Sequence, residues 1–228
     1  MSYSPETARL YSQLGISGTT YEPSYNEMQK ILNDLKGQTV LDFGTGTGRS
    51  ARLLKNLGAQ RVIGVDKNPN MILQAKKQHG NDIDFYLMSS IIPLPDDSVD
   101  VAISAHVLIE CNTKQEMVEA CKEISRVMKQ DGLFVMITTN PNSIGNDYIS
   151  YRYLPKENLV SGNKVTCHIK GDEGFEIEDT YWTKNDYHET LQQSGFVVEK
   201  SSLPLAEGTN WLDETRVAPD IVFICKKL

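Results

Sequence analysis

The chain has 228 residues, with 23 Lys and Arg against 30 Asp and Glu, which gives a net charge of -7 at neutral pH. This length suits one large domain, residues 1–228, that carries a small embellishment. The acidic balance lacks the positive field that drives binding to phosphate backbones, so we expect no nucleic-acid partner.

Cysteine spacing and hydropathy indicate the compartment. The 4 cysteines lie far apart without a C-x-x-C pair, so we expect neither a metal site nor a disulfide framework. No apolar run approaches the roughly eighteen residues of a membrane span, and the N-terminus lacks the charged-then-apolar order of a signal peptide. We therefore expect a soluble cytoplasmic protein with no membrane partner, and the pattern indicates no particular oligomeric state.

Residues 1–37 are expected to form a lead-in and one helix. Residues 1–20 are polar and show no sustained period, which predicts a loosely held segment. A helix begins at Glu22-Pro23-Ser24, with proline early as helix starts favour, and its apolar residues recur on one face that should pack on a sheet.

Residues 38–139 alternate strands with helices, beginning at a glycine-rich turn. The strand Thr39-Val40-Leu41 delivers Asp42 at its carboxyl end, and Gly44, Gly46 and Gly48 follow. Glycine is needed where backbone takes positive φ or lies flat against a ligand. Open α/β sheets bind ligands outside the carboxyl ends of their strands, so Asp42 should point into a site.

Spacing separates the known glycine-rich turns. Counting back from Gly48 places Phe43 where a phosphate-binding loop needs its first glycine, and Arg49 replaces that motif's lysine. The dinucleotide fingerprint fails by one position, because Arg49 stands where its third glycine belongs. The dinucleotide motif therefore stays open as an alternative, and with it a nicotinamide-dependent oxidoreductase.

The same alternation continues beyond the turn. Further strands are expected at 62–65, which ends in Asp66, and at 83–87, 100–104 and 133–138. Asn68-Pro69 should cap a helix over 71–79, and the capping box at Thr113 and Glu116 should open another. The last of these strands is an almost continuous apolar run, as in a parallel sheet buried on both faces.

The remaining chain holds an irregular stretch and a regular end. Residues 140–182 are rich in tyrosine, and within them 164–170 and 175–182 alternate apolar and polar residues around a glycine turn, which predicts an antiparallel hairpin. Residues 183–228 should form a helix ending at Gly195 and then two strands, 196–199 and 221–225.

Four motifs in register carry a family resemblance. The turn is D-x-G-x-G-x-G, and Val62-Ile63-Gly64-Val65 leads to Asp66 at the separation where an acid meets a ribose hydroxyl. Residues 94–104 are similar to an L-P-F-x-D-x-S-F-D stretch, and residues 123–133 to E-x-x-R-V-L-K-P-G-G. The chain thus resembles the class I S-adenosylmethionine-dependent methyltransferases of small-molecule type over about residues 38–139.

The resemblance implies a fold and a cofactor site. It implies a Rossmann-like, doubly wound sheet of seven strands, mostly parallel with the last strand antiparallel, plus the small hairpin insertion. Residues 38–139 would bind S-adenosylmethionine, and residues 140–182 would cover the acceptor, with a plain sheet extension as the alternative. The implied cofactor-binding residues are Asp42, Gly44, Thr45, Gly46, Gly48, Asp66, Lys67, Met71, Met88, Ser89 and Ser104.

One position departs from the family pattern. Met88 or Ser89 stands where many members have an aspartate that meets the adenine amino group. Either the serine or backbone takes that role, or packing holds the adenine.

The expected reaction is methyl transfer to a small-molecule acceptor, driven mainly by orientation. His106 follows the fourth strand and is the candidate catalytic base and acceptor contact, although this position is often only a wall. The other expected acceptor contacts are Tyr11, Tyr148, Tyr153 and His168. A non-catalytic cofactor-binding subunit is a further alternative.

Overall fold

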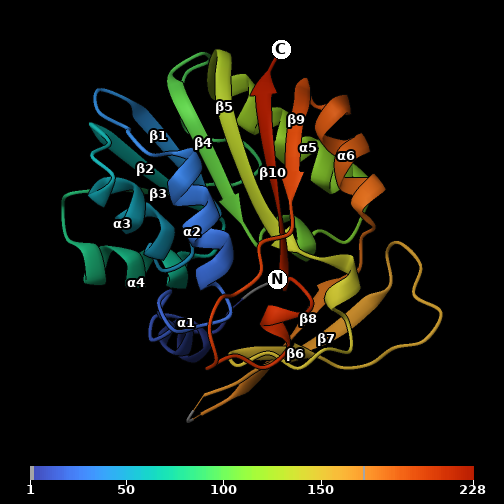
Figure 1. Ribbon diagram of the computed structural model, residues 1–228. Helices are drawn as coiled ribbons and strands as arrows, with labels where there is room; N and C mark the ends of the chain where they lie inside the picture. The colour runs from blue at the N-terminus through green and yellow to red at the C-terminus, as the bar shows by residue number, and fades with distance from the viewer. Residues whose placement is uncertain (1–2, 172) are drawn as a thin grey trace.

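The computed structural model describes residues 3–171 and 173–228. Its main element is a seven-stranded sheet in the order β3-β2-β1-β4-β5-β10-β9 (Figure 1). Its strands are β1 (Thr39–Phe43), β2 (Arg61–Asp66), β3 (Asp84–Leu87), β4 (Val99–Ala105), β5 (Met128–Thr139), β9 (Phe196–Ser202) and β10 (Asp220–Lys227). The last strand, β10, runs antiparallel to both of its neighbours, β5 and β9. The sheet confirms the Rossmann-like, mostly parallel fold.

Helices cover both faces of this sheet (Figure 1). One face packs against α2 (Glu22–Ile31), α3 (Arg49–Asn56) and α4 (Pro69–His79), and the other packs against α5 (Lys114–Val127) and α6 (Lys184–Gln193). Successive strand side chains point to opposite faces, so Val40 joins the first core and Leu41 the second. No helix of the described chain is both long and apolar enough to cross a membrane.

The strand order creates a switch point beside β1. The chain runs from β1 outward to β2 and β3, then returns to the opposite side of β1 as β4. The connection that leaves β1 runs toward β2 and the one that leaves the adjacent β4 runs the opposite way, toward β5, which opens a crevice at the carboxyl ends of these strands. The glycine-rich turn follows β1 at this point, so the fold places it at the mouth of the crevice.

The expectation of a loosely held lead-in is wrong. Residues Pro5–Tyr11 form helix α1, and the Ser4 hydroxyl caps it by accepting from the Thr7 N–H at 3.0 Å. The Asn68 and Asn70 side-chain amides both donate to the Tyr3 carbonyl, at 3.1 and 3.0 Å. The lead-in is thereby fastened to the start of α4, at the carboxyl edge of the sheet.

A second, three-stranded antiparallel sheet lies with α1 beyond the carboxyl ends of the parallel strands (Figure 1). Its strands are β6 (Tyr151–Tyr153), β7 (Lys164–Ile169) and β8 (Phe175–Thr180). The expected hairpin is confirmed as β7–β8. Strand β6 was not expected, because three residues are too few to show an alternating pattern. Single turns of 3₁₀ helix complete the structure at η1 (Leu108–Glu110), η2 (Pro141–Ser143) and η3 (Asp213–Thr215).

Candidate active site

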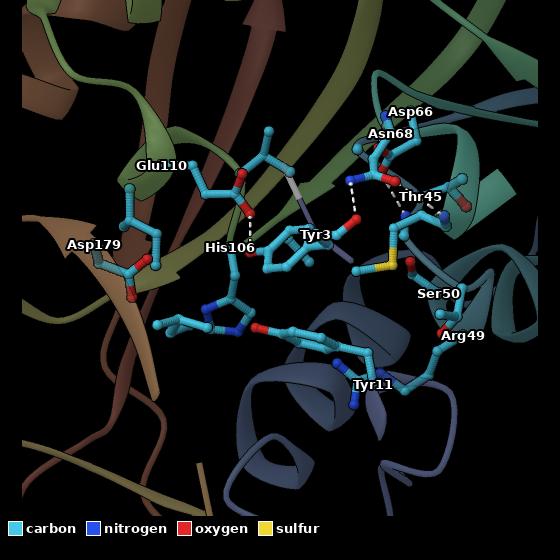
Figure 2. A pocket seen from close by; sticks show the side chains of 18 of the residues that line it. Tyr3, Tyr11, Thr45, Arg49, Ser50, Asp66, Asn68, His106, Glu110 and Asp179 are labelled. Carbon is cyan, nitrogen blue, oxygen red and sulfur yellow. Dashed lines mark hydrogen bonds between the residues drawn. The ribbon is translucent and has the colours of Figure 1, made fainter. Parts of the chain in front are cut away.

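A cavity of about 1100 Å³, a volume that includes solvent at its open mouth, lies between the carboxyl ends of the parallel strands, α1 and the small sheet. Figure 2 shows Thr45, Asp66 and Asn68 at one end and Asp179 at the other, with His106 and other side chains between them. The cavity therefore connects the glycine-rich turn with the segment that was expected to cover an acceptor.

The turn uses two of its glycines for different purposes. Gly44 has a φ of +70°, and a Cβ built there would lie 2.2 Å from Val107 Cγ2, so the fold itself requires glycine. Gly46 has a φ of +54°, but a Cβ there would meet no atom within 4 Å. Because Gly46 lines the cavity, the open space beside it is available to a ligand.

Asp42 does not point into the cavity, which corrects the expectation. Its side chain is fully buried, and Oδ2 accepts from the hydroxyls of Thr45 at 2.6 Å and Ser50 at 2.7 Å. Burial raises the pKa of Asp42 to about 6, although these hydrogen bonds oppose the shift. The carboxylate holds the glycine-rich turn against the first turn of α3, so its role here is to shape the site.

Asp66 lies on the cavity wall at the end of β2. Its Oδ2 accepts from the Gly46 N–H at 2.9 Å, and its Oδ1 accepts from the Asn68 N–H at 2.8 Å. Burial raises the pKa of this carboxyl, and the two backbone donors oppose the rise. One residue thus ties the glycine-rich turn to the start of α4 while presenting its carboxylate to the cavity.

The other predicted cofactor residues divide into two groups. The cavity wall includes Gly44, Thr45, Lys67, Met71 and Met88. Gly48, Ser89 and Ser104 do not line it: Gly48 packs against His79 and Phe85, Ser104 is buried within β4, and Ser89 is exposed. Met71 and Met88 line the wall and Ser89 does not, so the predicted Ser89 contact finds no support, while the packing and backbone alternatives stay open.

Arg49 was noticed in the sequence only as a mismatch to other motifs, but it lines the cavity. Its guanidinium carbon lies 4.4 Å from the centroid of the Tyr21 ring and 5.6 Å from that of Tyr25. Within the described part of the chain, it makes no salt bridge with a carboxylate. A cation held against aromatic rings without an anionic partner is suited to binding a carboxylate.

Residues of the lead-in cover one side of the cavity. The Tyr3 hydroxyl donates to Glu110 Oε1 at 2.7 Å, as Figure 2 shows, and Lys67 Nζ lies 3.8 Å from the same carboxylate. Tyr11 packs edge-on against Tyr3 and Phe175, with ring centroids 5.2 Å apart in both pairs. Tyr11 also lines the cavity, as its predicted contact with the acceptor requires. Tyr3 and Glu110 were missed, although Glu110 closely follows His106, which was a predicted site residue.

His106 lies at the carboxyl end of β4 and lines the cavity. Its φ of +58° is uncommon for a residue other than glycine, and its N–H is held by the Ile137 carbonyl at 2.9 Å. Burial lowers the pKa of the imidazole, and Asp220 Oδ2, 3.7 Å from Nε2, opposes that shift. Nε2 is buried and has no hydrogen-bond partner among the described residues.

Of the three acceptor residues predicted in residues 140–182, one lines the cavity and two do not. Tyr153 lines the cavity, and its hydroxyl donates to Asp179 Oδ2 at 2.7 Å. Tyr148 is buried in the core and His168 is 40% exposed, and neither lines the cavity, so their predicted acceptor contacts are not found. Asp179 was missed, although its place in the alternation of 175–180 put it on the apolar face of β8.

A glycine-rich turn at the switch point of this sheet order, with an acid at the end of the next strand, is the arrangement of a nucleotide-type cofactor site in a Rossmann-like fold. A family model described as a methyltransferase domain matches residues 41–136. The chain is 28% identical over 178 residues to the N-demethylindolmycin N-methyltransferase of Streptomyces griseus, with 75% of each chain covered.

Other similarities agree. A probable S-adenosylmethionine-dependent methyltransferase of Mycolicibacterium smegmatis is 29% identical over 161 residues, which cover 67% of this chain and 57% of that protein. The solved CcbJ methyltransferase of Streptomyces caelestis superposes with a TM-score of 0.70 at 18% identity, covering 96% of this chain and 95% of its own. The methyltransferase-domain match and these relatives support a class I S-adenosylmethionine-dependent methyltransferase, and they imply S-adenosylmethionine as its cofactor. The nicotinamide-dependent alternative is set aside.

Proposed function

We propose that the protein transfers the methyl group of S-adenosylmethionine to a small-molecule acceptor bound between the glycine-rich turn and the small sheet. The observation that carries this proposal is one continuous cavity that is lined by Gly46 and Asp66 at one end and by Tyr153 and Asp179 at the other. The names of two relatives, N-demethylindolmycin N-methyltransferase and demethylmenaquinone methyltransferase, support a small-molecule acceptor.

The described residues fit the cofactor. The Asp66 carboxylate would accept from the ribose hydroxyls, Met71 and Met88 would pack against the adenine, and the Arg49 guanidinium would bind the methionine carboxylate. The open space beside Gly46 supports this assignment, because the backbone there leaves room for a ligand.

Positioning would account for most of the catalysis. S-adenosylmethionine supplies a methyl group already activated by a positively charged sulfur. The acceptor's lone pair forms the new bond to carbon while the carbon–sulfur bond breaks and its electron pair goes to sulfur. Residues of the cavity wall would hold the acceptor in line for this displacement, which can lower a barrier by roughly 7–11 kcal/mol in well-oriented systems. Burial lowers the pKa of His106, so its imidazole is neutral near pH 7. Nε2 of this imidazole is the candidate base for a proton that the methyl acceptor loses.

The test combines binding with turnover. We expect the purified chain to bind S-adenosylhomocysteine by calorimetry and to transfer label from methyl-labelled S-adenosylmethionine to a pool of small molecules. Methylation confined to RNA or protein substrates would contradict the small-molecule proposal. Cofactor binding without any methyl transfer would instead support the non-catalytic subunit.

Paired hydroxyl deletions test which tyrosines serve the acceptor. Tyr153→Phe should lower turnover about 10-fold without changing cofactor affinity, because it removes a hydrogen bond of roughly 1.5–3 kcal/mol from the Asp179 carboxylate. Tyr148→Phe is the matched control, since its buried hydroxyl has no hydrogen-bond partner within the described chain and does not face the cavity. Initial rates and calorimetry on both variants separate the two effects. Equal turnover in both would remove Tyr153 from the acceptor site.

A further inference from the structure

An incompletely paired carboxylate stands on the acceptor side of the cavity. Asp179 lies on β8, and its side chain is 2% exposed and lines the cavity. Oδ2 accepts from the Tyr153 hydroxyl at 2.7 Å, and that hydroxyl also contacts Thr139 Oγ1 at 3.0 Å. The second oxygen, Oδ1, is buried and has no hydrogen-bond partner in the described residues.

Burying such a carboxylate is unfavourable unless hydrogen bonds and a positive charge compensate for the lost water. Burial raises the pKa of Asp179 to about 7. The ammonium of Lys164 attracts it weakly, but that group is bound to Asn112 Oδ1 at 2.7 Å and Thr180 Oγ1 at 2.9 Å. Across the described chain, no basic side chain lies within salt-bridge distance of Asp179. We therefore expect the partner of Oδ1 to be a ligand in the cavity.

The rest of the acceptor end has the chemistry of a cation site. Glu110 contributes a second, partly buried carboxylate, which accepts from Tyr3 and lies 3.8 Å from Lys67. The rings of Tyr11 and Tyr153 contribute to the cavity wall, and aromatic faces attract cations. An anionic acceptor would meet repulsion from the Asp179 carboxylate, whereas a neutral hydroxyl could satisfy Oδ1 without balancing its charge.

We propose that the methyl acceptor is a small molecule with a basic nitrogen, and that this nitrogen binds Oδ1 of Asp179. This inference rests on the proposed function. The bound ammonium gives one proton to the unpaired Nε2 of His106, where Asp220 stabilises the imidazolium. The freed lone pair then bonds to the methyl carbon as the carbon–sulfur bond breaks, with its electron pair passing to sulfur. The products are an N-methylated ammonium and a neutral thioether.

The experiment compares acceptors that differ only in the reacting group. Phenethylamine and tryptamine are assayed beside their alcohols, phenethyl alcohol and tryptophol, and beside the anion hydrocinnamate, with methyl-labelled S-adenosylmethionine. We expect methylation of the amines and not of the alcohols or the acid. Asp179→Asn should reduce amine methylation at least about 10-fold while S-adenosylhomocysteine affinity stays unchanged. Glu178→Gln, an exposed position on the opposite face of the same strand, should keep full activity.

A binding measurement covers acceptors that occupy the site without turning over. With S-adenosylhomocysteine present, the amines should raise the melting temperature of the wild type and of Glu178→Gln, but not of Asp179→Asn. The inference is overturned if the alcohols are preferred, if Asp179→Asn methylates amines normally, or if neither assay distinguishes amines from alcohols. Failure of the proposed function would differ, because no acceptor of any class would then be methylated.

Discussion

Replacing Gly46 with valine is expected to abolish measurable binding of S-adenosylhomocysteine while leaving the chain folded. A Cβ at this position would meet no protein atom within 4 Å, so the fold has room for it. The open space belongs to the cavity, where a branched side chain would take the place of the ligand. The φ of +54° also disfavours any side chain, at a cost of roughly 1–2 kcal/mol in stability. Calorimetric titration checks affinity, and thermal unfolding checks the fold.

Gly58→Val separates strain from occlusion. Gly58 has a φ of +89°, and a Cβ there also meets no atom within 4 Å, but the residue follows α3 away from the cavity. The two variants should lose similar stability, and Gly58→Val should keep wild-type affinity. If Gly46→Val binds S-adenosylhomocysteine as tightly as the wild type, the ligand does not approach the glycine-rich turn.

The sheet and its helices could be predicted because their signals are local. Strands β1, β2 and β5 are largely buried apolar runs, and helices α4 and α5 have capping side chains, such as that of Thr113, which accepts from the Glu116 N–H at 3.1 Å. The antiparallel hairpin was equally readable, since β7 and β8 alternate apolar and polar residues. Register and strand order follow from how these units stack, for which the family resemblance was needed.

The lead-in was mispredicted because tertiary contacts determine its structure. Helix α1 has only 7 residues, too few for a clear period, although Ser4-Pro5 is a recognisable start. Its position depends on partners far along the chain, including Arg9 with Glu173 at 3.0 Å and Tyr3 with Glu110. No local sequence pattern predicts contacts between such distant residues. The cover that the lead-in forms over the cavity could therefore be seen only in the structure.

In the candidate site, too, residues with a local sequence signal were predicted, and residues placed by tertiary contacts were missed or wrongly oriented. Gly46 and Asp66 were found because the spacing of the glycine-rich turn and the next strand end is a short-range signal. The direction of Asp42 was wrong, because a strand-end carboxylate can face either the crevice or the turn, and here the hydroxyls of Thr45 and Ser50 hold it inward. Asp179 could have been found, since the alternation of Phe175, Ile177 and Asp179 places a carboxylate on an apolar face.

Asp66 carries the second large prediction. Asp66→Ala should weaken S-adenosylhomocysteine binding by about 1–3 kcal/mol, or about 5- to 150-fold, the usual cost of losing a charged hydrogen-bond partner. The substitution removes the proposed acceptor of the ribose hydroxyls and also leaves the N–H groups of Gly46 and Asn68 without their carboxylate. Calorimetry measures the loss, and unfolding in denaturant shows how much of it comes from the turn.

Asp84→Ala is the control for Asp66→Ala. Asp84 lies on the neighbouring strand β3 in an exposed pair with Arg61 at 2.8 Å, so its removal should leave affinity unchanged. The pH dependence gives an independent check on Asp66. Burial raises the pKa of Asp66 above the value of about 3.9 that is usual for an aspartate. As the pH falls, the wild type should therefore lose cofactor affinity at a higher pH than an ordinary aspartate would cause. Asp66→Ala should lack that loss. Wild-type affinity in Asp66→Ala would remove this carboxylate from the cofactor site.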